Sequence, residues 1–105
     1  MEEWMRVCDE KSIKDGDMLD FDFGDRKILL AKSGGQIFAT GRICTHAYAD
    51  LSTGVLNQEE NTVTCPLHLS IFKLDTGVPQ NLPAEEPLKT YKLKIQENTI
   101  YIKLG

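Results

Sequence analysis

The chain has 105 residues and a formal net charge of −4 at pH 7, from 16 acidic and 12 basic residues. This length is that of one domain, and the 41% hydrophobic and 27% charged residues are typical of a folded chain rather than a disordered one. An acidic surface does not neutralise phosphates, so we expect no nucleic-acid partner. The three cysteines, an odd number, argue against a disulfide scaffold.

The first residues, Met1 to Arg6, form neither a basic leader with an apolar core nor a twin-arginine signal. The longest wholly apolar run, Ile28 to Ala31, is far too short to span a membrane. We therefore expect a cytoplasmic, monomeric protein without a membrane partner.

Short strands separated by turns are predicted in the N-terminal part. Leu19, Phe21 and Phe23 alternate with aspartates, which is the period of a half-buried strand. Ser33-Gly34-Gly35 has the composition of a hairpin turn. The segment from Asp9 to Lys14 allows at most one helical turn before Asp15-Gly16-Asp17. The expected strands cover residues 4–8, 18–23, 27–32 and 36–40.

The C-terminal part has the same pattern. Residues 88–95 alternate as a strand, Glu97-Asn98 predicts a turn, and residues 100–104 predict a final strand. Three of the four prolines lie between Val78 and Pro87, which excludes both a helix and a central strand and predicts a rigid loop. Residues 41–77, approximately, are therefore expected to be an insertion that the β framework carries.

The insertion contains both histidines of the chain. Cys44-Thr45-His46 and Cys65-Pro66-Leu67-His68 are separated by 18 residues. Each group offers one thiolate and one imidazole from a tight loop, and four such side chains can converge on a metal. Zinc fingers usually pair cysteine with cysteine and place their histidines on a helix. Mixed pairs on loops instead suit a two-iron cluster, and a structural zinc site is the alternative.

These two motifs resemble the signature of the Rieske family, Cys-x-His and Cys-x2-His on two loops. Further positions resemble the family, namely Leu51-Ser52-x-Gly54, Pro66, Phe72, Thr76-Gly77 and Pro87-Leu88-x-x-Tyr91. The resemblance implies an all-β fold, a Rieske-like antiparallel β-sandwich framework with a small inserted cluster-binding subdomain of two loops. Residues 1–105 would form one domain with one 2Fe-2S cluster. Cys44 and Cys65 would bind one iron, and His46 and His68 the other.

The short soluble members of this family are Rieske-type ferredoxins. The resemblance therefore implies a soluble one-electron carrier, not an enzyme, that passes electrons from a reductase to an oxygenase or another redox enzyme through the edges of His46 and His68. Two alternatives stay open. The first is a subunit similar to the small subunit of assimilatory nitrite reductases, and the second is a zinc-stabilised interaction module without a redox role.

The residues around the motifs predict a low reduction potential. High-potential relatives carry a further cysteine in each loop, where this chain has Ala49 and Leu67. They also donate hydrogen bonds from a serine and a tyrosine, which favours the more negative reduced cluster. Ser70 occupies the place of the serine, but Phe72 replaces the tyrosine and has no hydroxyl. We expect a potential near the low end of the family range, with a modest upward contribution from Ser70.

Three further segments carry expectations. Cys8 lies in the first strand without a partner and is expected to be a buried free thiol. The proline loop is expected to shield the cluster from water. Leu69-Ser70 stands where many soluble relatives have Gly-Gly, so the resemblance does not fix the local loop conformation or its number of hydrogen bonds.

Overall fold

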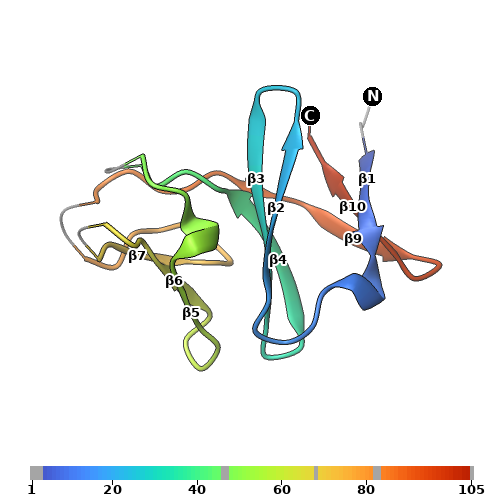
Figure 1. Cartoon of the computed structure of the whole chain (residues 1–105), viewed down its shortest axis with the longest axis horizontal. Helices are drawn as coiled ribbons and strands as arrows, with labels where there is room; N and C mark the ends of the chain where they lie inside the picture. The colour runs from blue at the N-terminus through green and yellow to red at the C-terminus, as the bar shows by residue number, and fades with distance from the viewer. Residues whose placement is uncertain (1–3, 46–47, 68, 82–83, 105) are drawn as a thin grey trace.

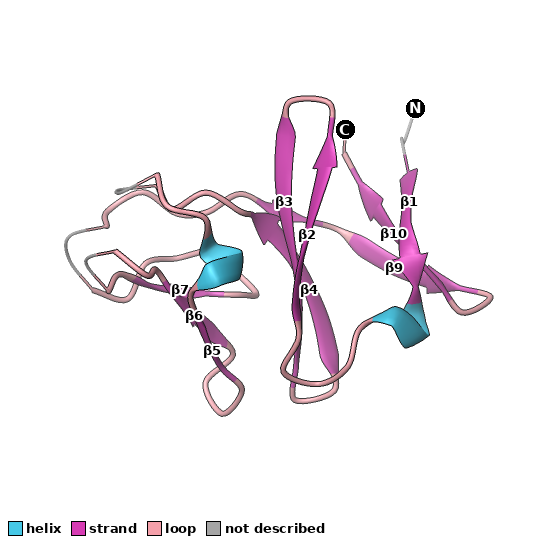
Figure 2. Ribbon diagram, in the orientation of Figure 1, coloured by secondary structure: helices cyan, strands magenta, loops and turns pink. Residues whose placement is uncertain are grey.

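The computed structural model describes residues 4–45, 48–67, 69–81 and 84–104. These residues form antiparallel strands and two single-turn 3-10 helices (Figure 2), so the all-β prediction is confirmed. In chain order the elements are β1 (Trp4–Asp9), η1 (Glu10–Ser12), β2 (Met18–Phe23), β3 (Arg26–Ser33), β4 (Gln36–Gly41), η2 (Leu51–Thr53), β5 (Val55–Asn57), β6 (Thr62–Thr64), β7 (Ile71–Lys73), β8 (Thr90–Tyr91), β9 (Leu93–Gln96) and β10 (Thr99–Lys103).

The strands form three sheets, with the orders β1-β10-β9, β2-β3-β4-β8 and β5-β6-β7. The central strand β3 is buried on both faces, which explains its apolar run. Ile28 and Leu30 pack with Ile100 and Ile102 of the first sheet. Leu29 and Ala31, which point the other way, join a second core that also contains residues of the third sheet. One strand therefore connects the two cores of the protein.

The predicted strand at residues 88–95 is interrupted at Lys92 and forms two strands. Tyr91 of β8 pairs with Ala39 of β4, whereas Ile95 of β9 pairs with Ile100 of β10. The chain thus passes from one sheet to the other at this point. The predicted turn after β9 is confirmed, because Glu97 and Asn98 both have positive φ angles, of 52° and 64°, as a tight hairpin requires.

The segment that we expected to be an insertion contains its own sheet, β5-β6-β7, at the end of the molecule away from the chain termini (Figure 1). The sequence predicted only loops here. Two motif glycines allow the close approach of backbone segments that this arrangement needs. A Cβ atom on Gly54 would lie 2.0 Å from the Thr64 carbonyl oxygen, and one on Gly77 would lie 2.1 Å from the Leu88 carbonyl oxygen. At both positions, therefore, only glycine lets the two backbone segments pack this closely.

None of the helices in the described part of the chain has the length and apolar composition needed to cross a membrane.

Candidate metal centre

The two motif cysteines meet in the core beside the third sheet. Cys44 follows β4 and Cys65 directly follows β6; both are fully buried, belong to the same core cluster and are free thiols. Burial raises the pKa of the Cys65 thiol, the Leu67 amide lowers it, and hydrogen bonding to Cys44 together with the charge of Cys44 raises it further. The two cysteines, 21 positions apart in the sequence, thus lie in the same buried cluster.

The other two predicted ligands, His46 and His68, lie outside the described residues. Of the four predicted site residues, the structure therefore places Cys44 and Cys65 together. Their neighbours Thr45 and Leu67 are described, and Leu67 is exposed.

The two cysteine loops close in the same way despite their different motif spacings. The Cys44 amide donates to the Ala49 carbonyl at 2.8 Å, and the Cys65 amide donates to the Ser70 carbonyl at 2.7 Å. Each bond therefore spans five residues. The fourth residue after each cysteine, Tyr48 or Leu69, has a φ angle of 56°. This left-handed conformation is costly for large side chains, by about 1–2 kcal/mol each.

The loop with the prolines contacts both cysteine loops, at the end of the molecule where the three gather (Figure 1). The Thr45 hydroxyl donates to the Glu86 carbonyl at 2.7 Å. On the other loop, the Asn81 side chain accepts a bond from the Ile71 amide at 2.7 Å and donates one to the Leu69 carbonyl at 3.1 Å. The proline loop is therefore attached to each cysteine loop by side-chain hydrogen bonds.

One buried hydroxyl in the centre has no protein partner. The Ser70 side chain is fully buried, and its Oγ atom has no hydrogen-bond partner in the described structure. Buried polar groups are nearly always hydrogen-bonded, so this hydroxyl indicates an acceptor other than the described residues. Two buried thiols, together with a buried hydroxyl donor on the residue whose carbonyl accepts from the Cys65 amide, fit an iron–sulfur cluster, whose sulfur atoms accept hydrogen bonds.

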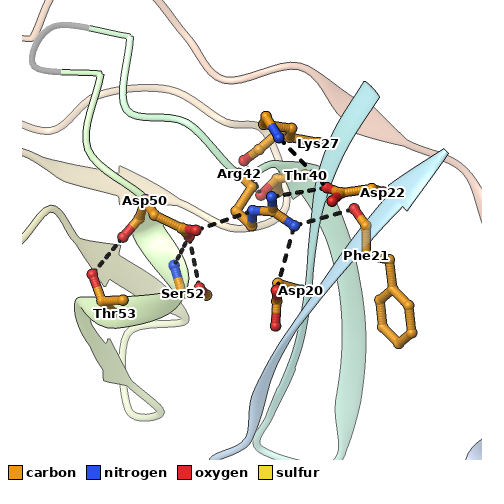
Figure 3. A network of polar contacts seen from close by, with 10 residues as sticks. Asp20, Phe21, Asp22, Lys27, Thr40, Arg42, Asp50, Ser52 and Thr53 are labelled. Atoms are coloured by element: carbon orange, nitrogen blue, oxygen red, sulfur yellow. Dashed lines mark hydrogen bonds and ion pairs between the residues drawn. The ribbon is translucent and has the colours of Figure 1, made fainter. Parts of the chain in front are cut away.

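A buried arginine attaches the first cysteine loop to the framework (Figure 3). Arg42 is only 5% exposed. Its Nη2 atom donates to Asp22 at 2.8 Å, its Nη1 atom donates to the Phe21 carbonyl at 3.2 Å, and its Nε atom lies 3.3 Å from Asp50 Oδ2. The guanidinium thus bridges β2 and the residue that ends the loop of Cys44.

Asp50 is itself fixed in place by a helix cap. Its carboxylate accepts bonds from the Ser52 amide at 2.9 Å and the Ser52 hydroxyl at 2.6 Å. Desolvation opposes ionisation of Asp50, but the hydrogen bonds from Ser52 and the charges of Arg42 and Lys27 lower its pKa below the usual value. Neither this network nor the contacts of Asn81 were predicted from the sequence. The one signal of the network was an arginine beside the first motif, with aspartates alternating along β2.

Comparison with known proteins agrees with this geometry. The family model described as the Rieske [2Fe-2S] domain matches residues 3–92. The ferredoxin component of biphenyl 2,3-dioxygenase from Rhodococcus jostii is 36% identical over 99 residues, covering 94% of this chain and 91% of that protein. The ferredoxin of carbazole 1,9a-dioxygenase from Nocardioides aromaticivorans superposes with a TM-score of 0.92 at 28% identity, covering 97% of this chain and 98% of that one.

Two further solved structures bear on partners and alternatives. A complex of reduced oxygenase and oxidized ferredoxin in carbazole 1,9a-dioxygenase contains a chain with a TM-score of 0.89 and 29% identity, covering 95% of this chain and 92% of that one. A nitrite reductase small subunit from Mycobacterium tuberculosis has a TM-score of 0.86 at 19% identity, covering 100% of this chain and 97% of that one, which shows a shared fold alone. The matched family model, the sequence relatives and the buried cysteine pair lead to one conclusion: the chain belongs to the Rieske [2Fe-2S] domain family.

Proposed function

We propose that this protein is a soluble, cytoplasmic one-electron carrier that accepts electrons from a reductase and delivers them to an oxygenase. It acts as a monomeric electron-transfer component and not as an enzyme. The observation that carries the proposal is that Cys44 and Cys65 share one buried cluster, while the buried Ser70 hydroxyl, in the loop of Cys65, has no partner among the described residues. Relatives that are named as ferredoxin components of dioxygenase systems support the same role.

We assign the cluster ligands by the family pattern. Cys44 and Cys65 hold one iron and His46 and His68 hold the other, within an insertion of about residues 41–77 in a single domain of residues 1–105. When bound, the cluster stores and releases one electron. The apolar core around Cys44 and Cys65 excludes water from these two cysteine ligands, and the Ser70 hydroxyl supplies a hydrogen-bond donor.

The reduction potential is expected to be low within the family range of about −150 to +300 mV. Phe72, where high-potential relatives have a tyrosine, is fully buried and offers no hydroxyl. Ser70 is thus the one hydroxyl at these two positions that can favour the reduced state.

Exposed apolar side chains support contact with a redox partner at this end of the molecule. Tyr48 is 82% exposed and Leu69 is 66% exposed, and each follows a proposed histidine ligand within two residues. Leu67, immediately before His68, is 52% exposed. Large apolar side chains with this exposure beside a redox centre favour docking of an apolar partner surface, which would also exclude water from the electron path.

The purified protein provides the test. We expect a red-brown protein with iron and acid-labile sulfide in equal amounts and an electron paramagnetic resonance signal only after reduction. Cys44→Ser and Cys65→Ser should lose the visible absorption, whereas the control Cys8→Ser should keep it. A colourless protein that contains zinc would instead support the interaction-module alternative.

A small subunit of a nitrite-reductase-like enzyme is the other alternative. It predicts that the protein co-purifies from its native host with a large catalytic subunit in equal amounts. Purification as a free monomer that reduces a dioxygenase component would support the carrier.

A further inference from the structure

The Asn81 side chain holds the second cysteine loop on both sides of Ser70. Its Nδ2 atom donates to the Leu69 carbonyl at 3.1 Å, and its Oδ1 atom accepts from the Ile71 amide at 2.7 Å. A single planar amide on the proline loop therefore binds the two residues that flank Ser70.

These two bonds constrain the backbone angles of Ser70. The Leu69 carbonyl belongs to the peptide plane that precedes the Ser70 Cα atom, and the Ile71 amide belongs to the plane that follows it. When both planes are bonded to one rigid group, φ and ψ of Ser70 cannot change independently of Asn81. The following plane is also held by the Ser70 carbonyl, which accepts from the Cys65 amide at 2.7 Å.

The loop needs such support because its backbone is unfavourable. Leu69 has a φ angle of 56°, a conformation that costs a non-glycine residue about 1–2 kcal/mol. The turned Leu69 carbonyl is satisfied by Asn81, which lowers the cost of this conformation. The Ser70 hydroxyl is meanwhile fully buried, and it has no hydrogen-bond partner among the described residues.

We propose that Asn81 is a positioning residue for the redox centre, which acts by holding the Ser70 hydroxyl in the direction from which it can donate to a cluster sulfur atom. This inference rests on the proposed function, since it requires a cluster. A donor to sulfur stabilises the more negative reduced state, so Asn81 raises the midpoint potential through Ser70.

A double-mutant cycle on the loaded protein tests the proposal. Ser70→Ala removes the donor, and Asn81→Leu removes both loop bonds while keeping a similar side-chain size. Each single variant should shift the midpoint potential downward in protein-film voltammetry. The double variant should shift it no further than Ser70→Ala alone, because Asn81 would then have no hydroxyl to position.

Gln80→Leu is the matched control, because Gln80 is the adjacent amide and its Nε2 atom donates to Val78 within the same loop, at 3.0 Å. This variant should leave the potential unchanged. Hydrogen exchange at the Ile71 amide, followed by mass spectrometry, should accelerate in Asn81→Leu and not in Gln80→Leu.

The possible results separate the two proposals. A wild-type protein without iron overturns the electron-carrier function and this inference together. If the wild type contains the cluster but Asn81→Leu leaves the midpoint potential unchanged, the inference alone is overturned. The same holds if Asn81→Leu lowers the potential equally in the wild-type and Ser70→Ala backgrounds. If Asn81→Leu loses its cluster during purification, Asn81→Asp replaces it, since the added charge shifts the potential in both backgrounds and the coupling to Ser70 remains measurable.

Discussion

Replacement of Arg42 by methionine should weaken the attachment of the first cysteine loop to the framework. The guanidinium donates to Asp22 at 2.8 Å and to the Phe21 carbonyl at 3.2 Å, and it lies 3.3 Å from Asp50. Methionine retains most of the buried aliphatic stem and removes these polar contacts. The substitution therefore tests the polar bridge rather than the packing.

The expected loss of stability follows from how deeply Arg42 and its aspartate partners are buried. Arg42 is 6% exposed by side chain, but Asp20, Asp22 and Asp50 are 68%, 56% and 38% exposed and stay hydrated without it. The loss should therefore be smaller than the 3–5 kcal/mol of breaking a fully buried ion pair, and larger than the 0–1 kcal/mol of a surface pair. We expect about 2 kcal/mol, which lowers the urea midpoint by roughly 1 M.

Urea unfolding of the loaded protein under anaerobic conditions measures this loss. Strand circular dichroism and the visible absorption of the cluster are followed together at one incubation time, because cluster loss makes unfolding irreversible. Lys27→Met is the control, since Lys27 lies 3.9 Å from the same Asp22 with its side chain 52% exposed, and it should cost under about 0.5 kcal/mol. Equal midpoints for the two variants would refute the reasoning.

Three further predictions concern other parts of the chain. The folded structure lowers the pKa of Asp50 below its unfolded value of 3.8, so the ionised carboxylate contributes fully to stability above pH 3.8. This contribution is lost as the pH falls through the lower folded pKa. The free energy of unfolding should therefore fall less steeply with decreasing pH in Asp50→Asn than in the wild type. Gly77→Ala should cost at least about 2 kcal/mol in urea unfolding, since the φ angle of Gly77 is +78° and the new Cβ would meet the Leu88 carbonyl. Gly35→Ala is the control and should cost less, because Gly35 has a φ angle of +83° but open space around it. Equal losses in the two variants would contradict the close approach at Gly77. Burial raises the pKa of the Cys8 thiol above 9.0, so this thiol should react more slowly with Ellman's reagent at pH 8 than free cysteine does, and a rate equal to that of free cysteine would argue against its partial burial.

Much of the framework was predictable from local patterns. The alternation of Leu19, Phe21 and Phe23 predicted β2, and Ser33-Gly34-Gly35 predicted the hairpin between β3 and β4, and the structure confirms both. These predictions succeed because strand alternation and turn chemistry are properties of neighbouring residues. The expectation for Cys8 was less accurate, since the thiol is only partly buried and packs against the core that contains Ile100 and Ile102.

The candidate site divides in the same way. The spacing of Cys44, His46, Cys65 and His68 indicated the metal chemistry, because the type of ligand depends only on which amino acids are present. The convergence of Cys44 and Cys65 is a property of the folded structure, and the ligand roles of His46 and His68 stay predictions. The two cysteine loops close with equivalent backbone hydrogen bonds, which the sequence did not predict because the two motifs differ in spacing.

The sequence by itself determined the family, the β class and the type of cofactor, because these depend on residue chemistry and short-range periodicity. Only the tertiary structure decided that the chain changes sheets at Lys92, that Arg42 joins the first cysteine loop to β2, and that Asn81 holds the loop around Ser70. Each of these depends on which distant backbone and side-chain groups are brought within hydrogen-bond distance. That choice follows from the packing of the two cores on either side of β3, which no local pattern contains.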